Sequence, residues 1–196
     1  MARSITEFLS NFTGGARANL YFVTISPGTG SSVANNSLLK GGVADSITFH
    51  AKGAQLPESA VGEIIVPYLG RQVKLPGDRT YADWNLTVLS DEAMKLRNVF
   101  ERWNADINGH TTNRPYGYQY GWVTTSVITV THLTRQGKET HQYKLYGAFP
   151  KDVGSVDVAY DNNDSIMEFP VTFAYTYHQI DNIASGVPPL LARPTP

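Results

Sequence analysis

The sequence predicts a mainly β protein, in which two packed antiparallel sheets form a β-sandwich or barrel with one flanking α-helix and a short N-terminal helix. Thr, Val, Tyr, Phe and Trp are abundant, and 17 Gly and 11 Pro residues interrupt them at short intervals. This composition favours strands over helices. Several segments also alternate apolar and polar residues with the two-residue period of a strand. The order helix, strands, one helix, strands then predicts a single β domain with one packed helix.

The first elements are a short helix and two strands. Ser4 and Glu7 form a capping box, and the residues that follow place one apolar face on a helix, namely Ile5, Phe8, Leu9 and Phe12. So short a helix needs a surface on which to dock. Strands are predicted at Leu20–Ser26 and Ile47–Lys52, separated by a Gly-, Ser- and Asn-rich inserted loop at 27–42.

The segment from Glu63 to Trp84 differs from the other strands. Its apolar runs are interrupted by Pro67, Gly70 and Pro76. Because proline cannot donate to a ladder, we expect an edge ribbon or projecting loop rather than a central strand.

A strand at 84–88 and the longer helix follow. Ser90 is the expected N-cap, with Asp91 and Glu92 in the first turn, and Asn108-Gly109 ends the helix. The expected buried stripe is Ala93, Leu96, Phe100 and Trp103.

The remaining chain predicts antiparallel strands. Trp122–Thr134 and His141–Phe149 flank a turn at 135–139, and Ser155–Tyr160 and Ile166–Tyr177 flank a turn at 161–164. Together these elements give one domain at 1–179. Residues 180–196 are a Pro-rich extension, expected to be extended or disordered.

Composition excludes several classes of function. The net charge of −1, from 16 basic and 17 acidic residues, gives no basic footprint for general nucleic-acid or membrane binding. The absence of cysteine removes disulfides and thiolate metal sites. No run approaches the roughly 20 apolar residues of a membrane span, and no signal peptide is evident after Met1. We therefore expect that the protein is made in a cytoplasm and is not anchored in a membrane.

No residue set predicts catalysis, a metal or a cofactor. His132 and His141 are expected to face each other across the Gly137 hairpin, but two histidines without a third ligand make a poor metal site. Asp78 and Asp83 are separated by Arg79 and fit turn stabilisation better than acid–base chemistry. We expect no enzyme.

Charges are unevenly distributed in the second half. Asp152, Asp157, Asp161, Asp164 and Glu168 outnumber Lys151, whereas Arg114, Arg135, Lys138 and Lys144 outnumber Glu139. These are either two solvated surfaces or patches that meet between copies of the chain.

The stretch from Ala51 to Trp103 resembles the tail tube proteins of contractile-tailed, myovirus-type bacteriophages. The matching features are Leu56-Pro57, the G-D-R-T-Y-A-D-W block, Thr87-Val88 and Asp91-Glu92-Ala93. The residues of the block that carry the family motif are Gly77, Asp78, Arg79, Thr80, Asp83 and Trp84. A second stretch, LYGAFPKDVG followed by DNNDSIMEFPVTF, matches independently. The 27–42 loop and the chain beyond Tyr177 are longer than in that family.

The resemblance implies a structural virion protein without cofactors. Six copies would form a ring whose sheets join into a barrel, and stacked rings would form the tube through which DNA passes into the host. Implied partners are other copies, the tail sheath, baseplate and tail terminator proteins, and the tape-measure protein and DNA inside the tube. The 63–84 ribbon would contact the next ring, through Ile64, Ile65, Val66, Tyr68, Arg71 and Lys74. Two alternatives stay open: the tube of a DNA-free bacteriocin or type VI secretion particle, and a monomeric ligand-binding β-barrel.

Overall fold

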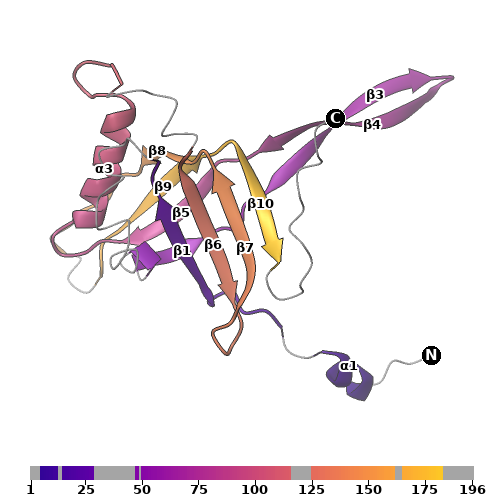
Figure 1. The fold of residues 1–196 in the computed structure, drawn as a ribbon, viewed down its shortest axis with the longest axis horizontal. Helices are drawn as coiled ribbons and strands as arrows, with labels where there is room; N and C mark the ends of the chain where they lie inside the picture. The colour runs from indigo at the N-terminus through magenta and orange to yellow at the C-terminus, as the bar shows by residue number, and fades with distance from the viewer. Residues whose placement is uncertain are drawn as a thin grey trace.

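The computed structural model describes residues 5–12, 15–28, 47–48, 50–115, 125–161 and 165–182. It confirms the predicted class: two four-stranded antiparallel sheets pack together, one helix flanks them, and a two-stranded hairpin projects from the domain (Figure 1). In the described part of the chain, no helix is long and apolar enough to cross a membrane.

The first sheet has the strand order β1 (Tyr21–Ser26), β6 (Val127–Leu133), β7 (Glu139–Tyr146) and β10 (Tyr177–Asn182). The β6–β7 hairpin is the one predicted from sequence, with Gly137 at a φ of 77° in its turn and His132 paired with His141. Every second residue faces the other sheet, and the fully buried ones include Val23, Ile25, Ile128 and Leu145.

The second sheet has the order β2 (Ala51–Ala54), β5 (Trp84–Leu89), β9 (Glu168–Ala174) and β8 (Phe149–Val153). The alternation predicted in two of these strands is present: Trp84, Leu86 and Val88 pair in register with Phe173, Val171 and Phe169, and all six are buried. These paired residues form one half of the core.

The helix α3 (Lys95–Ile107) packs on the same core, beside β8. Its buried side chains are Leu96, Val99, Phe100 and Trp103. The Phe100 ring lies 6.2 Å from Phe169 and 6.0 Å from Phe173, and the Trp103 ring lies 6.2 Å from Phe173. The predicted helix core, Leu96, Phe100 and Trp103, is therefore buried as expected.

The start of α3 was wrongly predicted. Ser90 does not cap the helix, because the N-cap position falls at Met94 and the Ser90 hydroxyl donates to Asp91 O at 3.3 Å. The Ser90 backbone N–H donates to Met167 O at 2.8 Å and so continues the strand pairing. The chain turns at Met94, with a φ of 51°, and Asp91 Oδ1 accepts a hydrogen bond from Leu96 N at 3.3 Å. Ala93 lies before the helix and is exposed.

Four strand predictions also need correction. Residues 47, 48 and 50 are helical, and the strand β2 starts only at Ala51, although Ile47 is buried as its apolar character suggested. Residues 154–159 form no regular structure. The predicted strands His141–Phe149 and Ile166–Tyr177 each break where the chain crosses from one sheet to the other.

These crossings lie next to each other. Gly147, with a φ of 64°, separates β7 from β8, and residues 175–176 separate β9 from β10. Thr176 N donates to Tyr146 O at 3.0 Å, which joins the two crossings. Corners at which strands change sheets are typical of packed sheets with crossed strands. β10 continues through Ile180 to Asn182, past the expected domain end at 179.

Some predictions fall outside the described residues. These are the Ser4 half of the capping box, residues 29–42 of the inserted loop, the start of the strand expected from Trp122, and residues 183–196 of the Pro-rich extension. The helix α1 (Ile5–Asn11) is present where the apolar period predicted it.

Candidate functional site

The ribbon predicted at 63–84 is a long, regular β-hairpin. Strands β3 (Ser59–Tyr68) and β4 (Arg71–Tyr81) pair along their length and project away from the two sheets (Figure 1). Leu69 and Gly70 form the turn, with φ angles of 45° and 77°. Two consecutive positive φ values define a type I′ turn, whose twist suits a two-residue hairpin.

The prolines do not interrupt this hairpin, contrary to the expectation from sequence. Pro67 pairs with Gln72, and Pro76 pairs with Glu63. Both strands are edges of a two-stranded sheet, so a proline can point its missing N–H side outward without losing a ladder bond. The hairpin projects from the domain with its pairing maintained through both prolines, so broken pairing is not the reason for the projection (Figure 1).

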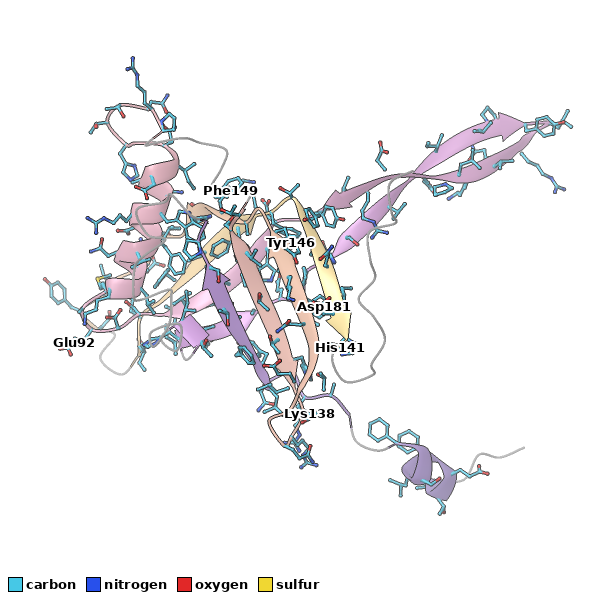
Figure 2. All side chains as sticks on the ribbon, viewed as in Figure 1. Glu92, Lys138, His141, Tyr146, Phe149 and Asp181 are labelled. Carbon is cyan, nitrogen blue, oxygen red and sulfur yellow. The ribbon has the colours of Figure 1, made fainter. Side chains whose placement is uncertain are left out.

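The hairpin has two chemically different faces. Cross-strand partners share a face and neighbours along a strand alternate. The pairs Ile64–Leu75 and Val66–Val73 therefore lie on one face, the apolar face, with Tyr68 and Arg71 at its tip. These four aliphatic side chains are 40–54% exposed. Figure 2 shows the side chains of the projecting hairpin standing away from the two sheets.

The opposite, mixed face carries Glu63, Ile65, Pro67, Gln72, Lys74 and Pro76. Lys74 Nζ and Glu63 Oε2 form an ion pair at 2.9 Å, with both side chains more than half exposed. Exposed pairs of this kind contribute only about 0–1 kcal/mol. Ile65 and Val66, adjacent in sequence, thus belong to different surfaces.

Sequence reasoning missed part of the apolar face. Val73 and Leu75 alternate with Gln72 and Lys74, which is the period of a strand with one apolar side. That alternation in β4 was the available signal. Of the predicted contact residues, the structure places Ile64, Val66 and Tyr68 together, Arg71 beside Tyr68, and Ile65 with Lys74 on the other face.

The family motif forms the base of the hairpin. Gly77 packs against Gly62 where the pairing shifts between Val61 and Glu63. A Cβ on Gly77 would lie 3.1 Å from Gly62 O and 3.2 Å from Gly62 C, so only glycine fits without a backbone shift. Asp78 and Thr80 are exposed strand residues of the same segment.

The other motif residues fasten this base to the sheets. Arg79 Nη1 donates to Ser59 Oγ at 2.8 Å across the hairpin. Asp83 accepts from Lys151 Nζ at 2.6 Å, and this bond raises the pKa of Lys151. Trp84 is buried, its Nε1 donates to Gln55 O at 2.5 Å, and its ring lies 5.6 Å from Phe173. The sequence predicted that Asp83 stabilises a turn, whereas the bond seen in the structure is an ion pair with Lys151 of β8.

An aromatic cluster completes the base. The Tyr81 ring lies 5.8 Å from Tyr175 and 5.4 Å from His178, at the crossing between β9 and β10. Burial, followed by the charge of Arg79, lowers the pKa of His178. Burial also raises the pKa of Tyr175, whose hydroxyl donates to Glu58 O at 3.2 Å. The hairpin thus leaves the domain from a fixed, partly buried anchor.

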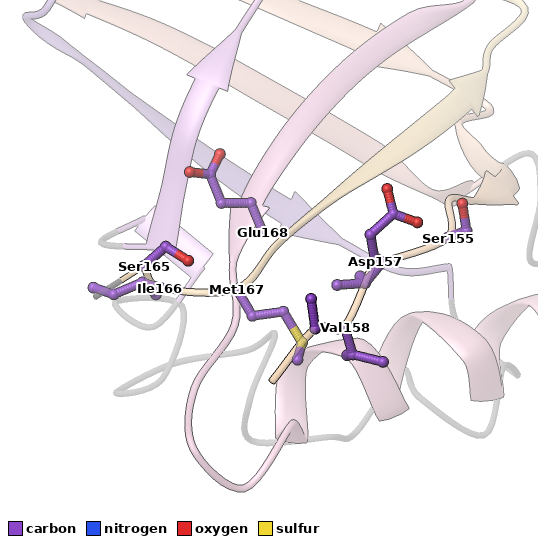
Figure 3. A pocket seen from close by; sticks show the side chains of 9 residues that line it. Ser155, Asp157, Val158, Ser165, Ile166, Met167 and Glu168 are labelled. Carbon is purple, nitrogen blue, oxygen red and sulfur yellow. The ribbon is translucent and has the colours of Figure 1, made fainter. Parts of the chain in front are cut away.

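The other residues singled out in the sequence are histidines and charged side chains outside the hairpin. Among the described residues, no group of three or more His, Asp or Glu residues could hold a metal. The acidic segment near α3 forms a shallow groove between residues 155–159 and 165–168 (Figure 3). Its Glu168 pairs with Lys52, and in the basic segment Lys144 pairs with Asp181 at 2.8 Å. The two charged patches are therefore partly neutralised within the chain.

Comparison with known proteins agrees with this arrangement. A protein-family model described as "Phage tail tube protein" matches residues 16–181. Tail tube protein gp19 of Enterobacteria phage T4 is 31% identical over 140 residues, covering 69% of this chain and 82% of that protein. The tail tube protein of Serratia phage KSP90 is 28% identical over 119 residues, covering 61% of this chain and 66% of that protein.

Solved structures share the fold at low identity. A chain from the baseplate of the anti-feeding prophage superposes with a TM-score of 0.62 at 10% identity, covering 88% of this chain and 99% of that chain. A chain from the sheath–tube complex of the PVC extracellular contractile injection system gives 0.55 at 12% identity, covering 93% and 100%. From the family match over most of its length and the T4 relative, this chain belongs to the phage tail tube protein family.

Proposed function

We propose that six copies of this chain close into a ring, that rings stack into the inner tail tube, and that the β3–β4 hairpin makes the contact between rings. The observation that carries this proposal is the exposed apolar face of the hairpin. A two-stranded hairpin alone is marginally stable in water, and exposed apolar surface of this kind marks an interaction site. A neighbouring ring would cover it.

The sheets supply a second requirement of a ring, which is open edges. The first sheet ends at β1 and β10, and the second ends at β2 and β8. Edge strands present unpaired backbone groups that can pair with another chain. Neighbouring copies that pair there would extend a sheet around the ring and form the barrel that the family resemblance implies.

As a phage tail tube protein, the chain is a structural component of the virion and not an enzyme. The proposed role is a conduit for DNA ejection. A conduit must let DNA slide, and strong phosphate binding by basic arrays would oppose that. The near-neutral chain, with Lys52 and Lys144 each paired to a carboxylate, fits a channel of this kind.

Proposed partners follow from the same role. They are the tail sheath outside, baseplate and tail terminator proteins at the two ends, and the tape-measure protein and DNA inside. Chains of similar fold come from a baseplate, a tube-terminating cap and a sheath–tube complex. One of those structures is an extracellular contractile injection system. The relatives that match in sequence are phage tail tube proteins, which favours the phage tail.

Electron microscopy of purified, concentrated protein tests the proposal. Rings with six-fold symmetry, or tubes of stacked rings, are expected, without covalent cross-links because the chain has no cysteine. Light scattering should show the same growth in mass with concentration. A protein that stays monomeric, with and without a baseplate to nucleate assembly, would refute the tube proposal.

A further inference from the structure

The helix α1 presents an apolar face that its own chain leaves uncovered. Ile5, Phe8, Leu9 and Phe12 are 52–79% exposed, and the rings of Phe8 and Phe12 stack at 5.2 Å. Figure 1 shows α1 standing clear of both sheets. A helix of 7 residues is too short to be stable in water by itself. Its fold therefore implies a surface that receives this face.

A groove of the right chemistry lies at the start of the first sheet. Its walls are mainly apolar and include Tyr21, Leu56, Val130 and Tyr143. Leu56 is 56% exposed, so its side chain is available for contact. The volume of about 470 Å³ falls within the roughly 300–1,000 Å³ of sites that hold a small ligand, enough for several apolar side chains.

The charges of the groove and of α1 are complementary. Arg17 supplies the positive charge among the residues that line the groove, and His132 Nε2 lies 2.9 Å from the backbone O of Arg17. The one charged residue in α1 is Glu7. A helix that places its apolar face in the groove can bring this carboxylate to the basic rim.

We propose that the groove receives α1 of a second copy of this chain. The groove's own wall contains residues 16–18, so only residues 13–15 join it to Phe12. Four residue steps span at most about 14 Å, and the Phe12 ring already lies against Gly15. To fill its own groove, α1 would have to reverse within this link. Docking of α1 in the groove of a neighbouring copy needs no such reversal of the chain. The inference rests on the proposed function, since the second copy is the neighbour in the tube.

Engineered cysteines can detect this contact, because the native chain has none. Phe8→Cys and Leu56→Cys are made as separate full-length variants, mixed under assembly conditions and oxidised. A disulfide dimer that contains one copy of each variant is expected on a non-reducing gel. The matched control mixes Phe8→Cys with Lys95→Cys, an exposed position at the start of α3. This mixture should give little mixed disulfide dimer. The variant that carries both Phe8→Cys and Leu56→Cys should form a ladder of linked copies.

Charge exchange provides a second readout. Glu7→Arg and Arg17→Glu should each raise the protein concentration needed for assembly, and the two substitutions together should restore it. Deletion of residues 1–12 should raise that concentration at least about tenfold, which corresponds to about 1.4 kcal/mol of association free energy. The melting temperature of the subunit should not change.

The outcomes separate this inference from the ring proposal. Suppose that the wild-type protein forms tubes, but the mixed cysteine variants give no disulfide, or the double-cysteine variant forms a disulfide only within single chains. That result would overturn the docking of α1 on a second copy and leave the tube assignment intact. Failure of the wild-type protein to form any ring would refute both.

Discussion

Placing two aspartates on the apolar face of the hairpin should abolish tube formation while the subunit stays folded. The variant is Ile64→Asp with Val66→Asp, because both side chains point to the same face. Ile65 and Val66 lie on opposite faces, so substituting that adjacent pair would disturb both surfaces at once.

The expected size of the effect follows from the exposed fractions. The four aliphatic side chains of the apolar face are 40–54% exposed, so about half of each remains to be buried. Complete burial of such a side chain contributes about 1.5–3 kcal/mol, which leaves roughly 3–6 kcal/mol for the four together at each contact. The variant removes about half of this and adds two carboxylates whose burial costs more than that of the apolar groups they replace.

Domain stability should change little, since these positions contact solvent in the single chain. Exposed substitutions usually alter the free energy of unfolding by less than about 0.5 kcal/mol. Circular dichroism and thermal melting report on the fold, and sedimentation with electron microscopy reports on assembly. Gln72→Asp is the matched control, because it adds a charge to the same hairpin on the mixed face and should still form tubes. Normal tubes from the double variant, or an unfolded subunit, would refute the assignment of this face to ring contact.

Four further predictions concern the anchor, the core and the channel. Gly77→Ala should reduce tube yield without lowering the melting temperature, because its Cβ would lie 3.1 Å from Gly62 O; unchanged assembly would show that the bulge tolerates a side chain. Trp103→Ala should cost about 3–5 kcal/mol of unfolding free energy, measured by denaturant titration, since Trp103 is fully buried; a parental value would place it outside the core. The lowered pKa of His178 means that the unfolded chain binds its proton more readily, so stability should be full above the ordinary pKa of 6.5 and fall below it. His178→Phe should flatten that decline in a series of melts from about pH 7.5 to about pH 5, and an equal decline in both proteins would assign it to other groups. Assembled tubes should retain no duplex DNA in filter binding, and tight retention that weakens steeply with salt would contradict the conduit.

Strands with strict alternation could be predicted well from sequence. In β5 and β9 the apolar residues fall at every second position and face one core. The stripe of α3 was equally clear, because Leu96, Phe100 and Trp103 have the helical period. These elements are determined by local pattern and by one buried face, and both are visible in the sequence.

Elements that depend on distant pairing could not be predicted in the same way. Ser90 resembles a helix cap, but the helix begins only at Lys95. The Ser90 N–H instead donates to Met167 O, a partner far along the chain, and so extends the strand pairing. The chain passes from one sheet to the other near Gly147 and Thr176. These positions likewise depend on which sheet has a free edge, and no local hydrophobic period in the sequence indicates them. At Ile47 the run is too short for its apolar spacing to distinguish a helical turn from a strand.

The hairpin was predicted to project, but its two faces emerged only from the register. Sequence spacing alone treats Ile64, Ile65 and Val66 as one apolar run. The register pairs Ile64 with Leu75 and Val66 with Val73 on the apolar face. It pairs Ile65 with Lys74 on the mixed face, so the run is divided between the two faces of the hairpin. The predicted contact residues therefore lack the β4 half of the apolar face, Val73 and Leu75, and include Ile65 and Lys74 of the other face.

The division of the hairpin into an anchored base and an exposed tip explains why the family motif lies at the base. Four motif residues make contacts within the subunit. Gly77 allows a close approach of two backbone segments, and Arg79 bonds across the hairpin. Asp83 forms an ion pair with β8, and the Trp84 ring is buried. A change at any of them would remove or disturb one of these contacts at the base of the hairpin. At the tip, by contrast, the proposed partner is another copy of the same chain. The tip and the surface that receives it are both encoded in the same chain. Substitutions at the two places can therefore compensate each other as long as the contact remains apolar. The base must therefore keep particular residues, whereas the tip needs only to keep a type of surface.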